Sequence, residues 1–144
     1  MTTNTGTFSA SPDQVWRVLA DGWLYPLWVV GASRMREVEQ AYPAVGSKLH
    51  HSFGVWPVLI DDNTEVTAAD PGVSLALRAR GWPAGEAAVT ITLEPVGAQT
   101  RVTIEEDAVS GPGVLVPKPV RAALIKWRNV ETLRRLSFLA ERRP

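Results

Sequence analysis

The feature that most constrains this chain is a change in the periodicity of its apolar residues. From Lys48 to Val109, apolar and polar residues alternate through five successive segments. From about Val120 to Arg142 the apolar residues instead repeat with the period of an amphipathic helix. A period of two gives each strand one buried face and one wet face, as in antiparallel sheets. We therefore predict an α+β fold in which a meander of strands is followed by one long helix.

A capped helix near the N-terminus adds to this order. Ser11 is suited to cap a helix, Pro12 fits its first position, and Gln14 can complete a capping box. The segment from Trp23 to Val30 predicts a second short helix, with Pro26 near its start. Two more strands are predicted on either side of these helices, at about Thr3 to Ala10 and Arg34 to Gln40.

Composition indicates an ordinary globular protein. The chain has 144 residues, of which 45% are hydrophobic and 21% charged, so we expect one domain over residues 1–144. It contains no cysteine, which excludes disulfides, thiolate nucleophiles and cysteine metal sites. The first residues lack the basic and apolar regions of a signal peptide, and the longest apolar stretch, Leu24 to Ala32, is too short to span a bilayer. We expect a cytoplasmic protein without integral membrane association.

Charge is unevenly distributed along the chain. Residues 118–144 carry eight Lys or Arg and two Glu, a net charge of +6. Because the whole chain is neutral, the remaining residues carry a net charge of −6. A basic helix can bind nucleic acid or an anionic membrane, or it can be the solvated outer face of a packed helix, partly neutralised by the acidic sheet. Because aromatic residues do not interleave with the basic ones as a stacking platform requires, we favour the solvated face and expect no nucleic acid.

Polar residues fall on the face of the sheet that is otherwise apolar. If consecutive strands pair through their short turns, one row across this face contains His51, Asp62, Leu77, Val89 and Glu106. Buried charge is costly unless it is paired or reaches water, so this row favours a cavity filled by water or ligand. Two alternatives stay open. His51 and Asp62 can pair with each other near the sheet rim, and Glu106 can lie at a wet strand end.

The same pairing predicts which side chains surround the cavity. Trp28 and Trp127 lie in the helices that would cap and cross it, although an aromatic side chain at such positions is more often part of a packed core than of a ligand wall. The predicted lining comprises Trp28, His51, Phe53, Ile60, Asp62, Leu77, Val89, Ile91, Ile104, Glu106 and Trp127.

Other chemistry finds little support. His50 and His51 are adjacent on one strand, so they point to opposite faces and cannot chelate one metal together. The sequence has no GxSxG motif, phosphate-binding glycine loop or dinucleotide fingerprint. We therefore expect neither a metal nor another cofactor.

Four short motifs, in their order and spacing, resemble the START-like superfamily, specifically the polyketide cyclase/dehydrase-type (SRPBCC) proteins. They are Ser11-Pro-Asp-Gln-Val-Trp16, Tyr25-Pro-Leu-Trp28, Leu93-Glu-Pro95 and Arg128-Asn-Val-Glu-Thr-Leu-Arg-Arg-Leu136. The resemblance implies a helix-grip fold, in which a curved seven-stranded antiparallel sheet wraps around a long C-terminal helix and two short helices follow strand 1. It also implies a pocket for a hydrophobic small molecule, without metal or redox cofactor.

This superfamily contains carriers, sensors, cyclases and chaperone-associated proteins, so three functional hypotheses remain. The first is binding of a lipid-like or polycyclic molecule by a monomer or homodimer. The second is a cofactor-free cyclase or dehydratase in which Asp62 or Glu106 acts as acid or base and His51 acts as its partner or orients it. The third is an interaction or regulatory module that uses the basic helix and exposed tryptophans.

Overall fold

The computed structural model describes residues 2–30, 32–55, 58–81 and 85–142. Seven strands form an antiparallel sheet in the order β1-β7-β6-β5-β4-β3-β2. The strands are β1 (Thr2–Phe8), β2 (Ala32–Val38), β3 (Lys48–Val55), β4 (Val58–Asp70), β5 (Ser74–Gly81), β6 (Gly85–Val96) and β7 (Gln99–Ser110). The helices are α1 (Pro12–Ala20), η1 (Gly22–Leu24), α2 (Tyr25–Trp28), η2 (Pro112–Leu115) and α3 (Lys118–Arg142), where η denotes a 3₁₀ helix.

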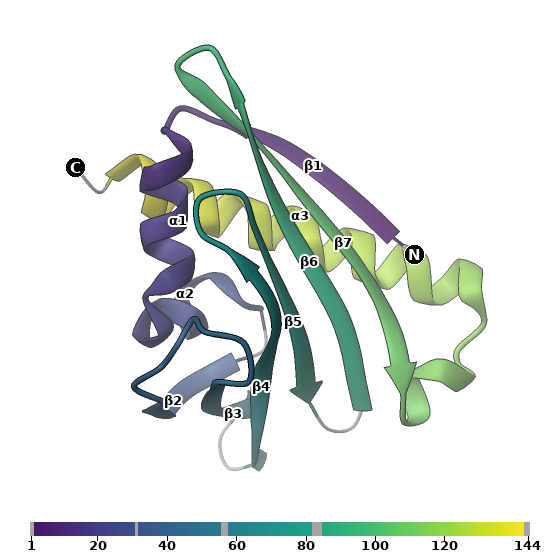
Figure 1. Cartoon of the computed structure of the whole chain (residues 1–144). Coiled ribbons are helices and arrows are strands. Elements are labelled where there is room, and N and C mark those ends of the chain that lie inside the picture. Colours follow the sequence, from purple (N-terminus) through teal and green to yellow (C-terminus); the bar gives the residue numbers. More distant parts are fainter. Residues whose placement is uncertain (1, 31, 56–57, 82–84, 143–144) are drawn as a thin grey trace.

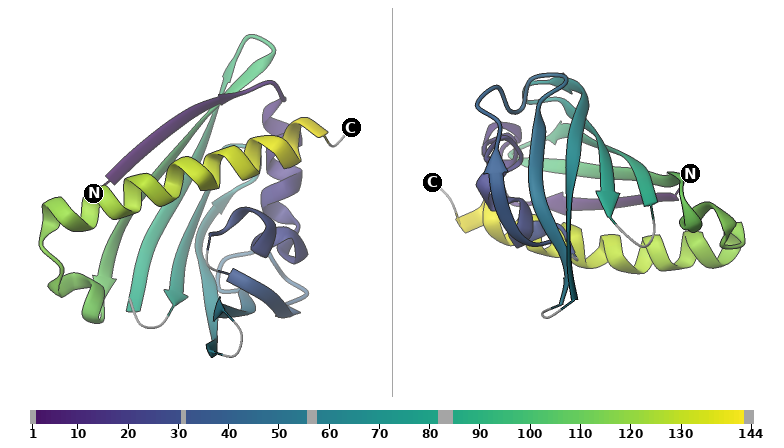
Figure 2. Two further views of the ribbon diagram at one scale, coloured as in Figure 1. Left: turned by 180° about the vertical axis from the view of Figure 1, so that it is seen from behind. Right: turned by 90° about the horizontal axis from the view of Figure 1, so that it is seen from below.

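The sheet curves around α3, which runs across one of its faces (Figure 1 and Figure 2). The chain passes from the edge strand β1 to the opposite edge strand β2 through α1, η1 and α2, which stand near the C-terminal end of α3 (Figure 1). The predicted helix-grip architecture is therefore confirmed. Within the described residues, no helix is long and apolar enough to cross a membrane.

Helix α1 begins as its sequence predicts. The Ser11 hydroxyl accepts a hydrogen bond from the Gln14 amide at 3.2 Å, and the Gln14 side chain accepts one from the Ser11 amide at 2.8 Å. This reciprocal capping box satisfies two amides that a helix start leaves unbonded. The second predicted helix is too long, because the chain forms only the 3₁₀ turn η1 and the single turn α2, which ends at Trp28.

The predicted strand registers are confirmed at three hairpins and wrong at one. His51 lies opposite Asp62, Leu77 opposite Val89, and Val89 opposite Glu106. Leu77, however, pairs with Val66 and not with Asp62. Strand β4 continues to Asp70, and its register shifts between Val66 and Ala68. The single row of side chains is therefore broken between β4 and β5.

The core occupies only part of the space between sheet and helices. Val15, Val18 and Leu19 of α1 are fully buried, and the second half of α3 adds Leu136 and Ala140. In the first half of α3, up to Asn129, the buried residues are Arg121 and Asn129, both polar. Polar side chains do not fill an apolar interior efficiently, so this end of the molecule is where a cavity is expected.

Candidate functional site

A cavity of about 520 Å³ lies between the sheet and α3. This volume is within the range of small-molecule pockets. Most of its lining is apolar, and the sheet strands β5, β6 and β7 supply one wall: Leu77, Ala79, Ala87, Val89, Ile91, Ile104 and Ala108. The helices supply the facing wall, which includes Trp28, Leu124, Ile125 and Trp127.

An ion pair with a buried carboxylate lines this apolar cavity. Glu106 points inward from β7 and is only 4% exposed. Arg128 of α3 donates a hydrogen bond to its Oε2, and Asn129 Nδ2 donates to its Oε1 at 3.2 Å. All three side chains line the cavity. A carboxylate removed from water requires such partners, so the pair joins sheet to helix and gives the cavity one polar wall.

A chain of three buried side chains runs from the cavity wall into the sheet. The hydroxyls of Tyr25 and Thr64 share a hydrogen bond of 2.9 Å, and His51 Nε2 lies 2.8 Å from the Thr64 hydroxyl. The His51 ring also stacks on Tyr25, with 5.3 Å between ring centres. Burial raises the pKa of Tyr25 to about 12 and lowers the pKa of His51 to about 4. Both groups are therefore neutral at pH 7.

Arginine side chains at the rim of the cavity form hydrogen bonds and ion pairs with neighbouring segments. The Arg121 guanidinium donates to Asp107 at 3.0 Å and to the carbonyls of Val114 and Val116, which attaches the segment around η2 to α3. Arg121 and Arg128 line the cavity, so the predicted solvated outer face does not include these two side chains. Both pair with acidic residues of β7, Asp107 and Glu106, and this is the predicted partial neutralisation by the acidic sheet. On the sheet side, Arg80 lies 3.2 Å from Glu86 and 3.5 Å from Asp62.

The structure brings together only part of the predicted site. Seven of the eleven expected residues line the cavity: Trp28, Leu77, Val89, Ile91, Ile104, Glu106 and Trp127. His51 and Asp62 are not among the described residues that surround it, because His51 stacks on Tyr25 and Asp62 faces Arg80. The backbones of Phe53 and Ile60 pair with each other, but their side chains lie outside the described part of the chain.

The burial of Glu106 decides whether this residue lies at a wet strand end, which was one of the two alternatives for the ionisable residues. Glu106 is buried and ion-paired, so it does not lie at a wet strand end. His50 points to the other face of β3 from His51, and its Nε2 lies 3.0 Å from Glu39. Within the described residues, no group of three or more potential metal-ligating side chains is close enough to hold an ion.

Sequence reasoning missed Tyr25, Arg128 and Asn129. A signal for Asn129 was present, since it interrupts the buried stripe that continues through Leu133 and Leu136 one and two helical turns later. A polar residue in such a stripe needs a buried partner, and that partner is Glu106. Arg128 is adjacent to Asn129 and lies toward the same face of α3. It was not singled out because α3 contains many basic residues.

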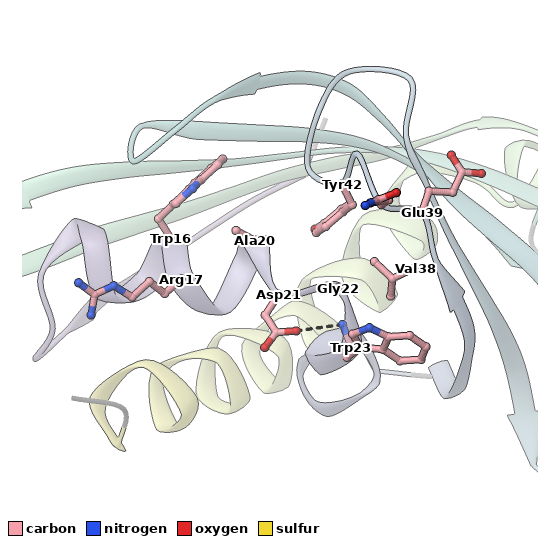
Figure 3. Close-up of a pocket in the computed structure, with 10 residues that line it drawn as sticks. Trp16, Arg17, Ala20, Asp21, Gly22, Trp23, Val38, Glu39 and Tyr42 are labelled. Atoms are coloured by element: carbon pink, nitrogen blue, oxygen red, sulfur yellow. Dashed lines mark hydrogen bonds between the residues drawn. The ribbon is translucent and has the colours of Figure 1, made fainter.

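A second hollow lies on the outside of the molecule between α1, η1 and the segment after β2 (Figure 3). Trp16, Trp23 and Tyr42 line it, and its polar groups already serve the local fold. The Tyr42 hydroxyl donates to the Leu19 carbonyl at 2.6 Å, and Asp21 accepts from the Trp23 amide at 3.2 Å. This hollow is more open to solvent than the cavity between the sheet and α3.

Comparison with known families identifies the class of protein. The sequence profile of the family described as "Polyketide cyclase / dehydrase and lipid transport" matches residues 2–141. The chain therefore belongs to this family, as the four motifs led us to expect. A sequence comparison with curated proteins finds no match.

Solved structures share the fold at low sequence identity. The Zhui aromatase/cyclase from Streptomyces sp. R1128 is 19% identical with a TM-score of 0.75, over 99% of this chain and 93% of that one. Protein CV1439 from Chromobacterium violaceum is 19% identical with a TM-score of 0.72, over 99% and 100%. The di-domain ARO/CYC StfQ from the steffimycin biosynthetic pathway is 16% identical with a TM-score of 0.73, over 99% and 45%. At these identities the likeness is one of fold.

Proposed function

We propose that the protein binds a largely apolar small molecule with at least one polar group, in the cavity between the sheet and α3. The observation that carries this proposal is the cavity of about 520 Å³ whose apolar wall encloses the paired side chains of Glu106 and Arg128. A filled core would not retain such a volume. The family description, which includes lipid transport, also supports a hydrophobic ligand.

The two walls would act differently on the ligand. The apolar wall removes ligand surface from water, which contributes about 25 cal/mol per Å² before the costs of association. The polar wall orients the ligand, because Glu106 accepts a hydrogen bond from a hydroxyl, whereas Arg128 and Asn129 donate to a carbonyl. This combination fits a polycyclic or lipid-like molecule with a hydroxyl or carbonyl group.

Filling the cavity tests this proposal. Val89 lies on the apolar wall, so Val89→Trp should occupy the space of the ligand and weaken binding of an apolar fluorescent probe by at least about tenfold. Val73→Trp is the matched control, because Val73 is exposed in the turn before β5 and does not line the cavity. Equal probe affinity in two folded variants would place the binding elsewhere and contradict the proposal.

A second candidate is a cyclase or dehydratase that acts on a related substrate. The observation that favours it is a carboxylate beside a cation within an apolar cavity, a setting in which Glu106 can exchange a proton with the substrate. In an aldol cyclisation, Glu106 would take a proton from carbon as that carbon bonds to a carbonyl carbon, and the protonated Glu106 would return that proton to the carbonyl oxygen. In a dehydration that follows, Glu106 would take a second proton from the same carbon and return it to the departing hydroxyl, which leaves as water.

The candidate catalytic residues can be separated by substitution. Glu106→Gln should abolish turnover, since Glu106 lines the cavity. Asp62→Asn should retain it, because Asp62 lies near Arg80 and not on the cavity wall. His51 would act only as a positioning residue, through Thr64 and Tyr25. Turnover by Glu106→Gln at the rate of the unmodified protein would remove this candidate.

A further inference from the structure

One end of the molecule exposes large apolar side chains. Leu115 at the end of η2 is 87% exposed and Trp127 of α3 is 79% exposed, and Val120 and Leu124 between them are more than half exposed. We call these four residues the apolar tip. Figure 2 shows η2 and the first turns of α3 at the extremity of the molecule opposite the C-terminus. Exposed apolar side chains that lie together are typical of a surface that contacts a membrane, another protein or a ligand.

The apolar tip is continuous with the cavity. Leu124 and Trp127 belong to the tip and also line the cavity, so they form part of its rim. Val116, which follows η2, lines the cavity as well. Arg121 donates hydrogen bonds to the carbonyls of Val114 and Val116, and these bonds hold the segment that contains Leu115 against α3. A ligand that crosses this rim therefore passes over the exposed apolar side chains.

The segment that forms this end, η2 and the first turns of α3, carries only positive charge. Residues 111–128 contain four Lys or Arg and no Asp or Glu. Arg121 and Arg128 are paired with Asp107 and Glu106, whereas the side chains of Lys118 and Lys126 are exposed. The surface of this end therefore combines the apolar tip with two exposed lysines. A partner that matches it in both respects has an apolar interior and a negatively charged surface.

We propose that the apolar tip docks on an anionic lipid bilayer, where Trp127 and Leu115 enter the interface and Lys118 and Lys126 meet the lipid headgroups. Tryptophan and leucine with flanking lysine are the residues that interfacial helices use. Each lysine near an anionic surface contributes roughly a fivefold gain in affinity, so the apolar side chains must supply the larger share. Passage of the cavity ligand between bilayer and protein rests on the proposed function. The docking itself rests only on this surface.

Cosedimentation of the full chain with phosphatidylcholine vesicles, with and without phosphatidylglycerol, tests the docking. The protein should sediment with the anionic vesicles, and Leu115→Glu should lower the affinity by at least about tenfold. The matched control is Phe138→Glu, the same kind of change at a 58% exposed residue near the other end of α3, which should bind as the unmodified protein does. Lys118→Gln with Lys126→Gln should reduce binding to the anionic vesicles alone.

Each outcome is decisive for one proposal. No sedimentation with anionic vesicles, or equal losses in Leu115→Glu and Phe138→Glu, would overturn the docking. A dimer in sedimentation velocity that Leu115→Glu dissociates, without vesicle binding, would overturn it in favour of a second copy of the chain. Vesicle binding that persists while the cavity fails to bind any apolar probe would overturn the proposed function and leave the docking intact.

Discussion

Glu106 is the residue on which the polar wall of the cavity depends. Its two carboxylate oxygens receive hydrogen bonds from Arg128 and Asn129, which come from the opposite wall. A carboxylate in this position both holds α3 against β7 and offers a polar contact to a ligand. Under the proposed function, the stability of the fold and the affinity for a ligand are coupled through this one side chain.

Glu106→Gln keeps the shape of this side chain and removes its charge. We expect a loss of about 1–2 kcal/mol in the free energy of unfolding, because Arg128 loses its counterion but still reaches solvent. Ligand affinity should fall by about tenfold. Urea unfolding and probe titration measure the two effects, with Glu105→Gln as control, since Glu105 is the adjacent residue on β7 and does not line the cavity. Equal behaviour of the two variants would contradict this role.

His51 makes stability dependent on pH. Burial lowers its pKa to about 4 in the folded protein, against about 6.5 in the unfolded chain. The unfolded chain therefore binds more protons between these values, so stability is complete above about pH 6.5 and falls as pH falls toward 4. From pH 7.5 to pH 5 the expected loss is about 2 kcal/mol.

The variant His51→Gln isolates this contribution. Its side chain cannot titrate in this range, so its free energy of unfolding should fall less than that of the unmodified protein between pH 7.5 and pH 5. The difference should be about 2 kcal/mol in urea unfolding at the two pH values. Parallel pH profiles for the two proteins would show that His51 is not buried in its neutral form.

At the scale of the elements, η1 packs closely against β2 and β3 at Gly22. A Cβ added to Gly22 would lie 2.6 Å from Leu49 and 2.7 Å from Val38, closer than side chains approach one another. Gly22→Ala should therefore cost about 1–3 kcal/mol through overpacking. Gly6→Ala in β1 is the control, because its Cβ would meet Phe8 at an ordinary 3.4 Å. Thermal unfolding of both variants checks the prediction, and a cost at Gly6 equal to that at Gly22 would contradict it.

Most elements could be predicted from periodicity, since alternation marks every strand from Lys48 to Val109 and the capping box marks α1. The register shift in β4 could not be predicted from periodicity. It falls among Thr67, Ala68 and Ala69, whose small side chains suit either face of a strand, so alternation carries no information there. That shift moves the pairing by one residue only, so it does not by itself separate Asp62 from Leu77. Strand β4 continues to Asp70, which lies opposite Ser74, so the turn lies further along the chain than the predicted row required, and Leu77 meets Val66.

The polar wall of the cavity was harder to predict than the apolar wall. Val89, Ile91 and Ile104 follow from strand alternation alone. Arg128 and Asn129 are placed by the packing of α3 across the sheet, which depends on long-range contacts between β7 and the helix. Local periodicity shows that a helix is amphipathic, but not which strand residue its polar side chains will meet.

At the scale of the whole molecule, the fold divides into a packed end and a hollow end. The second half of α3 packs with α1 through Leu136 and its neighbours, while the first half encloses the cavity with β5, β6 and β7. A ligand that binds only the folded state should stabilise it by about 2.7 kcal/mol when present at a hundredfold excess over its dissociation constant. Thermal denaturation with polycyclic and fatty ligands measures this gain, and Val89→Trp should abolish it.

The most direct measurement is native mass spectrometry of the purified protein, followed by organic extraction and identification of whatever is released. The cavity between sheet and α3 predicts a retained molecule that is largely apolar, carries a hydroxyl or carbonyl group, and is absent from Val89→Trp but present in Val73→Trp. A mass equal to that of the chain alone, together with no stabilisation by any apolar ligand, would contradict ligand binding in this cavity.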